Sequence, residues 1–157
     1  MIVLVGGCVT TAGNQEITEI SRYRNIEEGV STKINIYEEF GQPANVEKSA
    51  LNETIWTYYY AVMTQSAKNW IPYYGFIDGG VNQDISSTIF IFDTEDILTE
   101  LHTSEKRAQQ RFLEMWQVVG GGTDRSYFEN VKTEMLEMGL PFDEKKALML
   151  NGIAEAD

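Results

Sequence analysis

The first helical pattern along the chain covers residues 32–40, where three apolar side chains fall on one face. They are Ile36, Tyr37 and Phe40. Ser31 can cap the start of this segment, because a serine hydroxyl accepts a hydrogen bond from an unpaired amide of the first turn. Gly41 and Pro43 are typical of residues that end a helix. The pattern therefore predicts a short amphipathic helix.

Three later segments alternate in the manner of β-strands, at residues 54–63, 86–93 and 97–103. Their aromatic side chains share one face of the predicted sheet: Trp56, Tyr58, Tyr60, Phe90 and Phe92. Between the second and third segments, Asp93–Asp96 is interpreted as a tight turn, because aspartate side chains bond nearby backbone amides. We therefore expect an antiparallel hairpin, with the aromatic face covered by the helix over 32–40.

Helical patterns return after residue 103. Ser104 can cap a helix over residues 105–118, Asp124 can cap a second helix that ends before Gly139, and a short third helix is expected over 144–150. The second helix carries an apolar stripe of Phe128, Val131, Met135 and Met138. The fold class predicted is α+β, with helices packed on a three-stranded antiparallel sheet and a C-terminal helical extension.

Composition narrows the possible functions. The 157 residues include 12 Lys and Arg against 24 Asp and Glu, a formal net charge of −12, which argues against nucleic-acid binding. One cysteine and one histidine leave no internal disulfide and no Cys-rich zinc site, and they nearly exclude His-based catalytic or metal constellations. We expect no catalytic residues, no metal and no cofactor. His102 is interpreted as structural or exposed.

The only cysteine lies in a pattern typical of a bacterial lipobox. Val5 stands three residues before Cys8, and Gly6 and Gly7 supply the small side chains that a signal peptidase requires next to its cut. The alternative is a buried first strand that ends in an inert cysteine. No Lys or Arg precedes Cys8 and the apolar run is short, so residues 1–7 are interpreted as the remnant of a truncated signal peptide.

On this interpretation Cys8 is the lipid attachment site, with palmitate among its acyl chains, and residues 8–25 form a tether or a weak helix. Val9 follows the cysteine where inner-membrane lipoproteins usually carry Asp. The resemblance to lipoproteins therefore implies the periplasmic face of the outer membrane.

Residues 26–103 resemble the SmpA/OmlA family of small outer-membrane lipoproteins, to which BamE belongs. The resemblance rests on Gly29-Val30-Ser31, Phe40-Gly41-Gln42-Pro43, Trp56-Thr57-Tyr58 and Thr88-Ile89-Phe90-Ile91-Phe92-Asp93. It implies two helices on one face of a three-stranded antiparallel sheet, and residues 104–157 lie outside it. It also implies a non-enzymatic, lipid-anchored periplasmic accessory module whose partner is a protein, such as an outer-membrane assembly complex.

The link between the first two predicted strands, residues 64–85, is unusually long and aromatic. Its candidate contact residues are Trp70, Tyr73, Tyr74 and Phe76. They suit a protein partner or the headgroup region of a membrane. The alternative is that the link folds back to cover an open sheet edge.

Two other functions remain open from the sequence. A soluble periplasmic inhibitor or adaptor of related fold would use the helical tail as its contact element, with the stripe that contains Val131 and Met135 exposed. An unrecognised carboxylate-based hydrolase would need two converging carboxylates in an apolar cleft. Asp93, Glu95 and Asp96 lack calcium-loop spacing and favour a hairpin turn.

Overall fold

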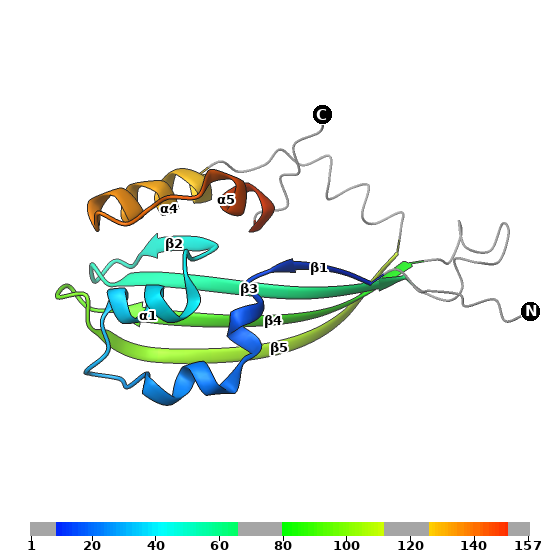
Figure 1. The fold of residues 1–157 in the computed structure, drawn as a ribbon, viewed down its shortest axis with the longest axis horizontal. Helices are drawn as coiled ribbons and strands as arrows, with labels where there is room; N and C mark the ends of the chain where they lie inside the picture. Colours follow the sequence, from blue (N-terminus) through cyan, green and yellow to red (C-terminus); the bar gives the residue numbers. More distant parts are fainter. Residues whose placement is uncertain (1–8, 66–79, 112–125, 151–157) are drawn as a thin grey trace, which may run out of the picture. The chain divides into compact units, whose positions relative to one another are not determined.

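The computed structural model describes residues 9–65, 80–111 and 126–150 (Figure 1). The chain forms two compact units. The larger unit comprises Ala12–Tyr60, Ser86–Ser104 and Thr123–Asp157, and the smaller one comprises Met1–Thr11, Ala61–Ile85 and Glu105–Gly122. Every contact discussed for the candidate site lies within the larger unit.

The sheet is antiparallel and has the strand order β1-β3-β4-β5. The strands are β1 (Val9–Gly13), β2 (Asn45–Lys48), β3 (Thr54–Gln65), β4 (Gly80–Phe92) and β5 (Leu98–Arg111). Short β2 also pairs with β3, in a register that sets Val46 opposite Trp56 and Lys48 opposite Thr54. The α+β class is therefore confirmed, whereas a sheet of only three strands is not, because β1 and β2 both pair with β3.

The helices described are η1 (Gln15–Thr18), η2 (Ile20–Asn25), α1 (Lys33–Phe40), α4 (Ser126–Glu137) and α5 (Glu144–Leu150). Helix α4 lies against β2 (Figure 1). Gln42 fixes the segment before α5, since its side-chain amide both donates to Asp143 O (3.2 Å) and accepts from Asp143 N (2.8 Å).

The core lies between α1 and the aromatic face of the sheet. The sheet residues Trp56, Tyr58, Phe90 and Phe92 are fully buried. Phe40, at the end of α1, contacts this face, with ring centroids 5.4 Å from Phe90. Each large side chain buried in this way stabilises the fold by roughly 1.5–3 kcal/mol. These four aromatic residues are therefore core residues, whereas Tyr60, expected on the same face, is only partly buried.

The start of α1 differs from the sequence prediction by one residue. Thr32 is the N-cap, and its hydroxyl accepts from Asn35 N, while the Asn35 side chain accepts from Thr32 N. Ser31 instead accepts a hydrogen bond from Glu27 N at 2.9 Å. Asn35 decides the position, because a side chain three residues after the cap completes a reciprocal pair. Gly41 ends the helix with φ of 73°, a value that glycine adopts without strain.

Residues 9–25 were expected to form a tether or a weak helix, and the structure describes a strand, β1, followed by the short helices η1 and η2. Residues 9–13 form β1, and Asn14 is buried, with its side-chain amide donating to Phe40 O (3.0 Å) and Gln42 O (3.3 Å). Ile17 belongs to the core. The physical reason is that helix α1 leaves carbonyl groups without partners at its C-terminus, and Asn14 supplies donors for this region.

The helix expected over residues 105–118 is wrong where it can be compared. β5 continues to Arg111 in the position beside β4, which itself begins earlier than expected, at Gly80. Strand pairing satisfies the backbone of this polar segment and overrides its helical spacing. The expected boundary between residues 103 and 104 therefore falls inside a strand, and residues 112–118 lie outside the described part of the chain.

The C-terminal stripe is part of the core. Val131 and Met135 on α4 are fully buried, and Phe128 and Met138 are partly buried. Helix α4 ends before Gly139, whose φ is 67°. The exposed stripe that a tail-mediated adaptor needs is therefore not observed.

The segment that precedes α1, residues 29–32, covers part of the outer strand β5. Gly29 N donates to Leu98 O, and Leu98 N donates to Ser31 O, both at 2.7 Å. Thr32 forms a bridge with Ile97. Backbone groups at the start of β5 are therefore paired by residues 29–32, which occupy the place of a further strand.

Candidate functional site

A buried lysine organises the end of the larger unit where α1 begins. Lys33, the first residue of α1, is 5% exposed. Its Nζ lies 2.6 Å from Asp96 Oδ1 and 2.6 Å from Glu134 Oε1, and it donates to Thr54 Oγ1 at 3.1 Å. A buried charge is tolerated only when it is paired and hydrogen-bonded, and Lys33 satisfies this condition.

Glu134 connects α4 to Lys33. The residue is 4% exposed and lies on the buried face of the helix between Val131 and Met135. Its Oε1 accepts from Trp56 Nε1 at 3.3 Å in addition to its contact with Lys33. Both contacts use Oε1.

Asp96 is placed by the turn between β4 and β5. Asp93 Oδ1 accepts from Glu95 N (2.8 Å) and Ile97 N (3.0 Å), which confirms the predicted turn. Asp96 has φ of 64°, and its carbonyl accepts from Lys33 N at 3.1 Å. The turn thus holds Asp96 against α1 through both backbone and side chain.

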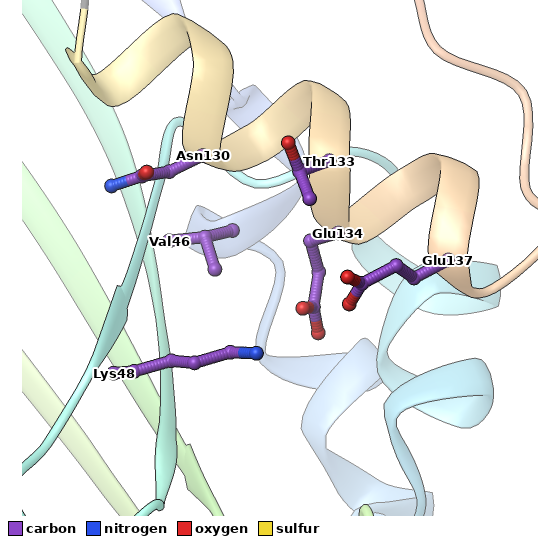
Figure 2. A pocket seen from close by; sticks show the side chains of 6 residues that line it. All are labelled: Val46, Lys48, Asn130, Thr133, Glu134 and Glu137. Atoms are coloured by element: carbon purple, nitrogen blue, oxygen red, sulfur yellow. The ribbon is translucent and has the colours of Figure 1, made fainter.

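Two adjoining pockets open beside this cluster, and we call them together the β2–α4 groove. One has a volume of about 390 Å³ and is lined by Lys33, Lys48, Asn52, Thr54, Asp93, Thr94, Asp96, Glu134, Glu137 and Met138. The other has a volume of about 290 Å³ and is lined by Val46, Lys48, Asn130, Thr133, Glu134 and Glu137. Figure 2 shows the second pocket, with the carboxylates of Glu134 and Glu137 on the same side of α4 and the Lys48 ammonium turned toward them.

The groove is polar and its net charge is negative. Four carboxylates line the larger pocket against two lysines, a formal charge of −2. Lys48 and Glu137 are exposed, and neither makes an ion pair within the described ranges. The groove therefore offers charges that are available to a ligand, together with amide and hydroxyl groups.

Burial raises the pKa of two tyrosines in the neighbouring core. The pKa of the Tyr58 phenol is well above 10.0 because the side chain is desolvated, and the negative charges of ionised Tyr37 and Tyr23 raise it further. Tyr58 donates to Gly41 O at 2.7 Å. Burial also raises the pKa of Tyr23, although its hydrogen bond with Thr88 opposes this shift. Both phenols are therefore neutral donors at physiological pH.

The residues predicted from sequence as contact or lipidation sites lie outside the described part of the chain. They are Cys8, Trp70, Tyr73, Tyr74 and Phe76. His102 is exposed and lies 2.9 Å from Glu100 Oε2. The predicted sites and the β2–α4 groove thus share no residue.

Sequence reasoning missed Lys33 and Glu134. A signal was present for Glu134, because an acid stands between the apolar residues Val131 and Met135 on the face that packs inward. Lys33 offered no comparable signal. Only the fold brings residues 33, 96 and 134 together, from three elements that are far apart in the sequence.

Comparisons with known proteins add no further assignment. No protein-family model, no curated protein and no solved structure matches this chain. Within residues 9–65, 80–111 and 126–150, no group of three or more His, Cys, Asp or Glu is placed to hold a metal ion. None of the helices in these ranges has both the length and the apolar character needed to cross a bilayer.

Proposed function

We propose that this protein is a lipid-anchored periplasmic accessory module that binds other proteins and is not an enzyme. The observation that carries the proposal is the lipobox-like sequence that ends in Cys8. It is supported by the SmpA/OmlA-like motifs, of which Phe40-Gly41-Gln42-Pro43 ends α1 and Trp56-Thr57-Tyr58 lies in β3. The anchor holds the domain at the periplasmic face of the outer membrane.

The described residues that flank Cys8 and the aromatic link support this proposal. β1 begins at Val9, the residue after Cys8, and pairs antiparallel with β3. The start of β1 therefore lies at the end of β3, where Gln65 leads into the aromatic link. The described residues that flank Cys8 and the link, Val9 and Gln65, therefore lie at the same end of the sheet.

This arrangement supports a contact role for the link. Trp and Tyr side chains suit both protein interfaces and the headgroup region, because one end is apolar and the other polar. We propose that the link contacts either a membrane-bound protein or the bilayer itself. The partner implied by the family resemblance is an outer-membrane assembly complex.

Mass spectrometry of the native protein extracted from membranes tests the anchor. We expect the mature chain to begin at Cys8 and to carry a diacylglycerol thioether and an N-terminal acyl chain. The Cys8→Ser variant should be unmodified and recovered in the soluble fraction. An unmodified Cys8 on a full-length precursor would contradict the proposal.

Cross-linking tests the contact role separately. A photoreactive residue at position Tyr73 should cross-link a defined membrane protein or lipid in cells, whereas the same residue at exposed Leu51 should not. Equal labelling at both positions would show that the link has no dedicated contact.

A further inference from the structure

We draw no further inference here: the strongest candidate, the apolar sheet face that carries Ile55, Ile89 and Ile91 on the side of β3 and β4 opposite the aromatic core, supports no proposal because nothing in the described part of the chain shows what covers it.

Discussion

Lys33 and Glu134 form an ion pair of 2.6 Å although both side chains are buried. The pair joins the first residue of α1 to the inward face of α4, across 101 positions of sequence. A positive charge at a helix N-terminus opposes the helix dipole, so this position favours lysine only because carboxylates surround it. The pair thus fixes how α4 docks against the rest of the larger unit.

Breaking the pair from one side should be strongly destabilising. Lys33→Met should lower the free energy of unfolding by about 3–5 kcal/mol, because it leaves the buried Glu134 carboxylate without its cation. Glu134→Leu should lower it by less, because Lys33 keeps its ion pair with Asp96 and its hydrogen bond to Thr54. In the double variant the free energy of unfolding should fall by much less than the sum of the two single losses, since neither charge of the pair remains. Urea denaturation of the four proteins measures the coupling, and additive losses would argue that the two residues act independently.

A methyl group at Gly13 should disrupt the pairing of β1 with β3. A Cβ atom there would lie 2.1 Å from Tyr59 O, and the φ of Gly13 is 100°. We expect Gly13→Ala to cost about 3 kcal/mol or more from this clash. Gly29→Ala is the control, because its φ of 78° is also positive but nothing lies within 4 Å of the added Cβ. It should cost only about 1–2 kcal/mol, and equal losses would contradict a close approach at Gly13.

The stripe on α4 should behave as core. Met135→Ala should lower the free energy of unfolding by about 2–5 kcal/mol, since Met135 is fully buried. The neighbouring Leu136 is 62% exposed, so Leu136→Ala should change stability by less than about 0.5 kcal/mol. Thermal and urea unfolding of both variants provide the comparison. A neutral Met135→Ala would revive the view of the helical tail as a free contact element.

Alkaline pH should unfold the protein through its buried tyrosines. The pKa of Tyr58 is raised above 10.0 in the folded protein, so below pH 10 the phenol is neutral in both states and its contribution is fully present. As the pH rises further, the unfolded chain ionises first and the free energy of unfolding falls. The loss continues until the folded pKa is reached.

The Tyr58→Phe variant tests this origin. At pH 8 it should be about 1 kcal/mol less stable, because it loses the hydrogen bond to Gly41 O. Between pH 10 and pH 11 its stability should fall less steeply than that of the unchanged protein, while Tyr23 maintains part of the slope. Urea denaturation across this range measures both effects. If the free energy of unfolding falls equally with pH in both proteins, the loss of stability at alkaline pH belongs to other groups.

Much of the framework could be predicted from local patterns. Residues 54–63 and 86–93 alternate so clearly that β3 and β4 were expected with Trp56 and Phe90 facing inward, as observed. Helix α1 was expected because its apolar residues share one face of a helix and Gly41 follows them as a helix-ending residue. These features depend on neighbours in sequence, which is why the pattern alone predicts them.

Features that depend on distant partners could not be predicted in this way. Residues 105–111 have helical spacing, yet they form strand because β4 supplies pairing groups. Residues 9–13 have no strong strand pattern, and their place beside β3 is a tertiary contact. The Lys33–Glu134 pair is the clearest case, since no spacing rule connects two residues on separate helices.

The bridging of β5 by residues 29–32 also affects how this protein behaves among its neighbours. A bare outer strand is a template on which another chain can extend the sheet. Here Gly29 and Ser31 already satisfy the backbone of Leu98. The start of β5 is therefore closed to sheet extension by another chain.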